Sequence, residues 1–356
     1  MTIISKLANI AAIKAQLKAA IRAKSVSISD TLPLSQYPAK IQEIPLAAVD
    51  NLELAYVDSG AGFVINVLTL KAPCSYIQDY AFQNCRFKRV IFPNTLRYIG
   101  SYSLNLNTLL EYIEIPSTVT NLGIAVFKGC TALVEAVCNQ SDSTMNGEFF
   151  GGCVKLKKVT LGPSIKILAS NVFNGCTLLE SVNTEYIESL SVSCFAGCNA
   201  IVDLNFPSLT TLISSGTLVS IPNLENVNFG KVANFQFTNV LASCPKVKKL
   251  IFTDKSVGFV SSSFVTLAGL KYIEFNALGA MNIANNAFTG MTALAAIVFK
   301  TSTPPTIGGT TPFAGYPAAM KIYVPDAAVS AYKAATNWSV LAPYIYPMSE
   351  FVMPTL

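Results

Sequence analysis

The sequence predicts a β-rich solenoid of about 11 coils, with an α-helical segment before it and a helical cap after it. The main observation is a repeat of 22 to 25 residues, in which an aromatic or aliphatic position is usually followed by Gly, Cys and Leu. Short strand-like segments follow the Cys position, and the period breaks near both ends of the chain. Equal spacing indicates one unit stacked on its own copies, because the elements of a globular core differ in length. The repeat positions are Phe82, Leu104, Phe127, Phe150, Phe173, Phe195, Leu218, Leu241, Phe264, Phe288 and Phe313.

Residues 1–48 lie outside the repeat and are expected to be helical. Apolar residues at alternating steps of four and three form a heptad pattern, which predicts a helix over residues 3–24. Either this helix docks on its own domain, or it self-associates into a homo-oligomer whose register Lys14 helps to set. A short helix started by a proline is expected over residues 37–44. The residues expected to serve oligomerisation or attachment are Ile3, Leu7, Ile10, Lys14, Leu17 and Ile21.

Residues 49–75 are expected to form capping strands. Residues 63–70 read Phe-Val-Ile-Asn-Val-Leu-Thr-Leu, a composition typical of a strand. We expect this strand to begin the sheet that the repeats extend and to cover the edge of the first coil.

Residues 76–325 form the predicted solenoid, and the strands after each Cys position should pair as a parallel ladder. Prolines after several strands end the pairing, because proline has no N–H group. Four positions after Cys, charges of opposite sign often alternate between neighbouring coils, which predicts weak, exposed ion pairs. The expected pairs are Arg89 with Glu111, Lys157 with Glu180, and Glu225 with Lys248.

Six of the nine cysteines occupy one repeat position, where other copies carry mostly apolar residues. This exchange indicates a buried column of free thiols. Disulfides are a weaker alternative, because stacked coils could bring neighbouring thiols close. No metal site and no cofactor are expected, because the chain has no histidine and no CxxC pair. The column consists of Cys85, Cys130, Cys153, Cys176, Cys198 and Cys244.

Residues 326–356 are expected to cap the open end of the array, as a solenoid requires. Asp326 is placed to N-cap a helix over residues 327–335. Trp338, Tyr332 and Tyr344 should then cover the end of the core.

Composition excludes several classes of protein. Hydrophobic residues make up 51% and charged residues 13%, which excludes a disordered chain. A net charge of +5 without basic blocks gives no basis for nucleic-acid binding. No apolar run approaches the length of a membrane span, so no membrane insertion is expected. Basic residues interrupt the first 24 residues, which makes a secretory signal there unexpected.

Four tyrosines form the candidate ligand-binding patch. The repeat register places Tyr76 over Tyr98 and Tyr80 over Tyr102, on the first two coils. Such a patch could hold sugar rings by apolar contact. The alternative is that it packs against the N-terminal segment.

No catalytic residues are expected. Without histidine the chain has no triad or neutral-pH imidazole base, and it has no HExxH or Walker motif. Its acidic residues are scattered singly. They do not rule out a glycosidase that uses a carboxylate pair, but sequence spacing alone does not bring two of them together. We therefore expect a protein that is not an enzyme.

The repeat, exemplified by residues 173–182, and the ending from Ile322 to Ser339 resemble the BspA-like branch of the leucine-rich repeat superfamily over residues 75–345. This resemblance implies a surface adhesin or interaction protein of gut or oral bacteria, or of their phages. The first 45 residues resemble, more weakly, the N-terminal segments of phage tail and fibre proteins. Residues 23–26 and 34–41 carry this second resemblance.

The two resemblances together favour a non-enzymatic phage virion protein of the tail or head fibre or decoration type, assembled in the host cytoplasm. Residues 1–48 would attach it to other virion proteins, and the repeats would face a host surface glycan or protein. A missing export signal fits, because virions are released by lysis. The alternatives are decoration without ligand binding and a bacterial cell-surface adhesin or interaction protein.

Overall fold

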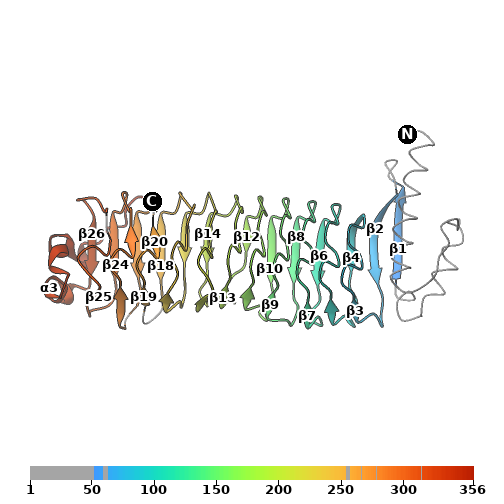
Figure 1. The fold of residues 1–356 in the computed structure, drawn as a ribbon, viewed down its shortest axis with the longest axis horizontal. Helices are drawn as coiled ribbons and strands as arrows, with labels where there is room; N and C mark the ends of the chain where they lie inside the picture. Colours follow the sequence, from blue (N-terminus) through green and yellow to red (C-terminus); the bar gives the residue numbers. More distant parts are fainter. Residues whose placement is uncertain (1–51, 59–62, 254–256, 266, 278, 314) are drawn as a thin grey trace, which may run out of the picture.

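The computed structural model describes residues 52–58, 63–253, 257–265, 267–277, 279–313 and 315–356. The chain is a β-solenoid of about 12 turns, against about 11 expected from the repeat. Figure 1 shows the coils stacked side by side as a rod, with β1 near one end and α3 at the other. The predicted N-terminal helices lie outside the described residues.

The first ladder contains one strand from each coil, paired in parallel with the next, as predicted. It is divided into two seven-stranded sheets between β12 and β14. The predicted strand β2 begins this ladder, and β1 (Leu52–Asp58) pairs antiparallel with it and covers the edge. The parallel strands are β2 (Phe63–Leu70), β4 (Phe87–Ile91), β6 (Tyr112–Ile115), β8 (Glu135–Cys138), β10 (Lys158–Leu161), β12 (Ser181–Val182), β14 (Asp203–Asn205), β16 (Asn226–Asn228), β18 (Lys249–Phe252), β21 (Tyr272–Phe275), β24 (Ala296–Phe299), β26 (Lys321–Val324) and β27 (Ile345–Pro347).

A second ladder of shorter strands runs along the same rod. In the two-residue strands the second residue is buried and the first faces outward, because successive side chains in a strand point to opposite faces. Two further short strands, β20 (Phe264–Val265) and β23 (Phe288–Thr289), pair with each other. The strands of the second ladder are β3 (Tyr76–Ile77), β5 (Tyr98–Ile99), β7 (Asn121–Leu122), β9 (Thr144–Met145), β11 (Ile167–Leu168), β13 (Ser189–Leu190), β15 (Thr211–Leu212), β17 (Asn234–Phe235), β19 (Val257–Phe259), β22 (Met281–Ile283) and β25 (Thr306–Ile307).

The core between the ladders consists of columns of like residues. Phe150 stacks on Phe127 with ring centroids 5.8 Å apart, and Phe173 stacks on Phe150 and Phe195 at 5.8 and 5.2 Å. All four rings are fully buried. Full burial of such a side chain stabilises the fold by about 1.5 to 3 kcal/mol. Repetition of one residue type in each column thus supplies a continuous core.

Two backbone positions in almost every coil have left-handed conformation, with φ between 52° and 84°. One lies two residues before the repeat position and the other two residues after it. The second column is mostly glycine, because glycine adopts positive φ without a steric penalty. This explains the Gly that precedes Cys in the repeat. Gly129, Gly152, Gly175, Gly197, Gly290 and Gly315 occupy this column.

The cysteine column is held by hydrogen bonds as well as by burial. The Cys153 and Cys176 thiols each donate to the carbonyl oxygen of the repeat position one coil earlier, Phe127 and Phe150, at 3.1 Å. Asn107 occupies the same position and donates from its amide to the Phe82 carbonyl at 2.8 Å. Its amide nitrogen is therefore satisfied within the column, whereas its buried Oδ1 has no hydrogen-bond partner among the described residues.

All nine cysteines are free, as predicted. Five of the six column thiols are buried, whereas Cys85 in the first coil is half-buried. Of the other three, Cys74 is half-buried and Cys138 and Cys194 are buried.

Two of the three predicted ion pairs are confirmed: Lys157 with Glu180 at 3.7 Å and Lys248 with Glu225 at 2.9 Å. The predicted pair of Arg89 with Glu111 is wrong. Arg89 is in register with Tyr112, and its guanidinium lies 5.7 Å from the centre of that ring. Lys88 pairs with Glu111 instead, at 3.8 Å.

The C-terminal cap contains a 3₁₀ helix (Asp326–Ala328), α3 (Val329–Ala334) and a second 3₁₀ helix (Ser339–Tyr344). Trp338 and Tyr332 are fully buried over the last coil, as predicted. The Trp338 indole donates to the Pro305 carbonyl at 2.8 Å, and the Tyr332 hydroxyl donates to the Thr301 carbonyl at 3.0 Å. Within the described residues, no helix is long and apolar enough to span a membrane.

The predicted N-cap role of Asp326 is wrong. Neither the first 3₁₀ helix nor α3 has a side-chain cap hydrogen bond. The Asp326 carboxylate instead accepts a hydrogen bond from the Ser349 N–H at 2.9 Å. This bond is the main reason that the pKa of Asp326 is lowered. A contact with the chain 23 residues later thus replaces the local cap.

The tail after β27 turns back over the outer face of the first ladder, beginning with a 3₁₀ helix (Met348–Glu350). Phe351 packs edge-to-face on Tyr323 with ring centroids 5.0 Å apart and contacts Tyr272 at 6.0 Å. Lys271, the residue before β21, donates to the Thr355 carbonyl at 3.0 Å. The tail thus covers an apolar cluster outside the main core.

The thiols provide a test of this packing. Burial raises the pKa of Cys130, Cys176 and Cys194 from 9.0 to about 12, so these thiols stay protonated in the folded chain. Their stabilising contribution is present below about pH 9 and is lost as pH rises toward 12. We expect Ellman's reagent at pH 8 to modify at most the two half-buried thiols in the native protein, and all nine after denaturation. Rapid modification of more than two native thiols would contradict the buried column.

Candidate ligand-binding surface

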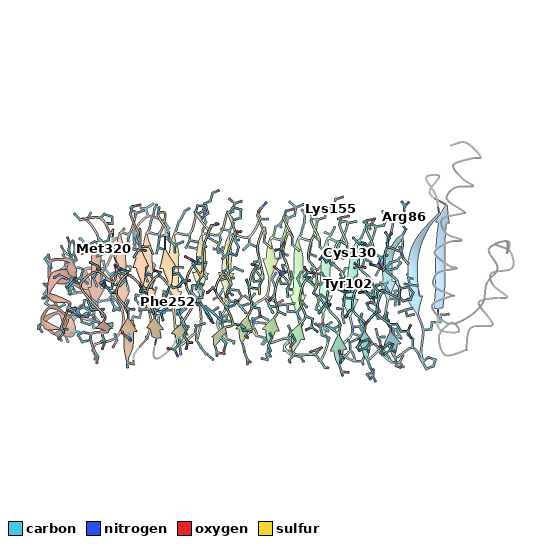
Figure 2. All side chains as sticks on the ribbon, in the orientation of Figure 1. Arg86, Tyr102, Cys130, Lys155, Phe252 and Met320 are labelled. Atoms are coloured by element: carbon cyan, nitrogen blue, oxygen red, sulfur yellow. The ribbon has the colours of Figure 1, made fainter. Side chains whose placement is uncertain are left out.

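Four side chains on the first coils form what we call the tyrosine surface: Tyr76, Tyr80, Tyr98 and Tyr102. Tyr76 and Tyr98 are the outward residues of β3 and β5 and pair in register. Their rings stack with centroids 4.3 Å apart and planes 7° from parallel. Tyr80 and Tyr102 stack at 5.2 Å and 1°. Both stacks predicted from the sequence are confirmed, and Figure 2 labels Tyr102 near the N-terminal end of the rod.

The surface is open to solvent at its outer rings. Tyr76 is 54% and Tyr80 55% exposed, whereas Tyr98 and Tyr102 are half-buried. Within each pair one face of each ring is used by the other ring. In the described part of the chain, no further ring stacks on the outer face of Tyr76 or Tyr80. Among the described residues, each pair therefore has one ring face that no other ring covers. The alternative, packing of these rings against the N-terminal segment, concerns residues outside the described part of the chain.

Polar groups lie at the edge of the same surface. The Asp79 carboxylate accepts hydrogen bonds from the Ser101 N–H at 2.8 Å and from the Tyr98 hydroxyl at 3.4 Å. Burial, then the neighbouring Tyr76 and Asp79, raise the pKa of Tyr98. The Tyr98 phenol is therefore a hydrogen-bond donor at neutral pH.

Tyr80 and Tyr102 occupy the left-handed column that precedes the repeat position, with φ of 59° and 55°. A bulky side chain in this conformation is rare and costs on the order of 1 to 2 kcal/mol. Other coils place smaller or more polar residues there: Ala125, Glu148, Asn171, Ser193, Gly216, Asn239, Ser262 and Asn286. The two tyrosines are thus placed against local backbone preference, a feature that is concentrated at functional sites.

This arrangement suits binding better than bond cleavage. It offers aromatic faces for apolar contact, with phenol and carboxylate groups for hydrogen bonding. It carries a single carboxylate, Asp79, whereas glycoside hydrolysis uses two. Among the described residues no group of His, Cys, Asp and Glu could hold a metal ion.

The other predicted site residues, which belong to the oligomerisation or attachment segment, lie outside the described residues. Their role stays a prediction. They are Ile3, Leu7, Ile10, Lys14, Leu17 and Ile21.

The repeat array matches a known family. The sequence model of the BspA type leucine rich repeat region matches residues 62–180 and 178–295, about two thirds of the chain. The chain belongs to the BspA-type leucine-rich repeat family. The predicted resemblance is thereby confirmed for the repeats. The match begins at residue 62, so it gives no support to the resemblance of residues 1–45 to phage proteins.

Solved structures of bacterial leucine-rich repeat proteins are similar to this chain. A protein from Bacteroides ovatus is 18% identical with a TM-score of 0.45, and covers 79% of this chain and 94% of its own. A leucine rich cell surface protein from Faecalibacterium prausnitzii is 16% identical with a TM-score of 0.28, and covers 73% and 93%. The T. pallidum leucine rich repeat protein is 24% identical with a TM-score of 0.37, and covers 54% and 87%.

No curated protein has significant similarity to the chain. The family assignment rests on the match to the repeats alone.

The left-handed tyrosines give a matched pair of substitutions. We expect Tyr102→Asn to change the free energy of unfolding by less than about 1 kcal/mol, because relief of the left-handed conformation offsets the lost stack. Tyr98→Asn lies in extended backbone, has no such relief and should destabilise by about 1 to 3 kcal/mol. Denaturant unfolding of both variants measures the difference. Equal destabilisation would show that the Tyr102 ring is required for packing.

Proposed function

We propose that this chain is a non-enzymatic bacterial cell-surface adhesin or interaction protein, whose tyrosine surface binds a host surface glycan or protein. The observation that carries this proposal is the pair of exposed ring stacks, with Tyr80 and Tyr102 in left-handed backbone. Membership of the BspA-type family supports it, because the sequence resemblance implies surface adhesins and interaction proteins.

The stacked rings are suited to recognition because they are ordered before a ligand arrives. Each ring restrains its neighbour, so binding immobilises little additional side-chain freedom. The outer faces of Tyr76 and Tyr80 can contact the C–H face of a sugar or an apolar protein side chain. Asp79 and the tyrosine hydroxyls can then fix its orientation by hydrogen bonds.

The virion hypothesis differs in where the chain acts, and it leaves the role of the tyrosine surface unchanged. It draws on residues 1–48, with their expected homo-oligomer and attachment to other virion proteins. Those residues lie outside the described part of the chain and outside the family match. The cell surface is therefore the location we propose, with the virion as the alternative.

Binding can be tested with the double variant Tyr76→Ala/Tyr98→Ala. The wild-type chain should bind at least one member of an array of host-type glycans and extracellular-matrix proteins. The double variant should bind that probe about tenfold more weakly or worse, because central aromatic contacts dominate binding energy. Tyr186→Ala is the control, since Tyr186 is 37% exposed on a later coil and should not affect binding. Equal binding by the double variant, or no bound probe, would contradict the proposal.

A further inference from the structure

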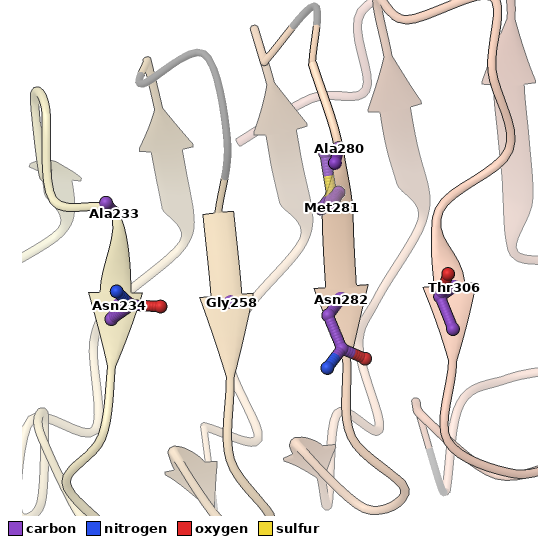
Figure 3. Close-up of a pocket in the computed structure, with 7 residues that line it drawn as sticks. All are labelled: Ala233, Asn234, Gly258, Ala280, Met281, Asn282 and Thr306. Carbon is purple, nitrogen blue, oxygen red and sulfur yellow. The ribbon is translucent and has the colours of Figure 1, made fainter.

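A hollow of about 360 Å³ lies on the outer face of the second ladder, near the C-terminal end of the rod. Four outward positions, on β17, β19, β22 and β25, stand in register across it: Asn234, Gly258, Asn282 and Thr306. Figure 3 shows the two asparagines on the strands either side of Gly258, with Thr306 on the next strand. The volume is at the lower end of the range for small-molecule sites.

The hollow exists because Gly258 has no side chain. The other coils carry a side chain at this outward position, including Thr144, Ser189 and Thr211. Glycine inside a strand weakens it, and often marks a backbone bend or a close approach by another backbone or a ligand.

The fold itself does not require glycine at this position. The φ of Gly258 is not in the left-handed region, so other residues could adopt its conformation. An added Cβ would lie 2.9 Å from the Asn234 Oδ1, the movable end of a side chain, and 3.8 Å from the nearest backbone atom, the Ala233 oxygen. The absence of a side chain at Gly258 leaves the backbone at this position open to close approach by a ligand.

The walls of the hollow offer unused hydrogen-bonding groups. The side-chain amides of Asn234 and Asn282 and the hydroxyl of Thr306 form no hydrogen bond with any other part of the described chain. All three residues are exposed. The two amides stand on strands about 9.5 Å apart, twice the spacing of neighbouring strands. Each amide can both donate and accept, as paired recognition of hydroxyl or acetamido groups requires.

The lining also selects against other ligands. Among the described residues, the seven that line the hollow include no charged side chain, and the polar groups they offer are neutral. A peptide cannot add as a strand, because β19 is already paired with β17 on one side and β22 on the other. Ala233, Ala280 and Met281 complete an apolar margin.

We propose that the hollow centred on Gly258 binds one neutral sugar residue of a glycan. Its ring lies over Gly258, and its hydroxyl or acetamido groups bond to the amides of Asn234 and Asn282. This site stands on different coils from the tyrosine surface and does not depend on it.

The test uses the full chain and saturation-transfer NMR with the methyl glycosides of glucose, galactose, mannose and N-acetylglucosamine. At least one glycoside should receive saturation from the wild-type protein. Because the tyrosine surface is itself proposed to bind a glycan, these substitutions are made in the Tyr76→Ala/Tyr98→Ala background. There Gly258→Thr, which fills the gap with a residue found at the same position in other coils, should reduce the transfer at least about fivefold, and Asn282→Ala similarly. Ser189→Thr, an added methyl group on the same ladder, is the matched control and should leave the transfer unchanged.

The melting temperature of Gly258→Thr shows whether this variant loses the transfer because its hollow is filled or because it fails to fold. Gly258→Thr should keep or raise the melting temperature, because threonine favours a strand more than glycine does. Transfer that persists when Gly258→Thr is added to the Tyr76→Ala/Tyr98→Ala background, or no transfer from the wild-type protein to any of the four glycosides, would overturn the proposal. Loss of transfer only in Tyr76→Ala/Tyr98→Ala would also overturn it and assign the sugar to the tyrosine surface.

Discussion

In-register stacking of the coils is the constraint on which the rest of the structure depends. Strands pair with the equivalent strands of neighbouring coils, and loops do the same: the Gly152 N–H bonds to the Asn174 carbonyl and the Gly175 N–H to the Ala196 carbonyl, both at 2.7 Å. A residue type repeated along the sequence therefore becomes a column in space. The stacked phenylalanines, the thiols that bond to the preceding coil and the two left-handed columns all follow from this one relation.

The same constraint explains how surface features arise without disturbing the fold. Outward positions of the second ladder contact solvent, so their identity is free to vary from coil to coil. Tyrosine in two successive coils gives a ring stack, and glycine between two asparagines gives a hollow. A binding site on such a solenoid can therefore form from the outward residues of neighbouring coils in one column. The buried residue next to each of them in its strand still packs in the core.

Features that depend on register could be predicted from the sequence, including the ladder, the cysteine column, the tyrosine stacks and the buried Trp338. The predictions were wrong where a side chain's partner is determined by a contact distant in the sequence or by the alignment of the strands. Arg89 and Glu111 each lie four residues after the Cys position of their coil, which predicted that they pair. Alignment of the strands instead places Arg89 beside Tyr112. Asp326 satisfied a local capping rule but bonds to Ser349. The hollow at Gly258 was missed because recognising it requires the backbone φ and the absence of nearby backbone. Strand-like alternation around an unexplained glycine is the sequence signal that could have found it.

The register can be measured directly as distances between spin labels, introduced as unnatural amino acids to spare the native thiols. Labels are placed at the outward positions Thr144, Asn234 and Thr306 of the second ladder. Asn234 and Thr306 are separated by three strand pairings. In-register stacking predicts that the distance from Thr144 to Thr306 exceeds that from Thr144 to Asn234 by about 14 Å, three strand spacings. A difference that does not correspond to three spacings would contradict the columns from which the core and both proposed sites derive.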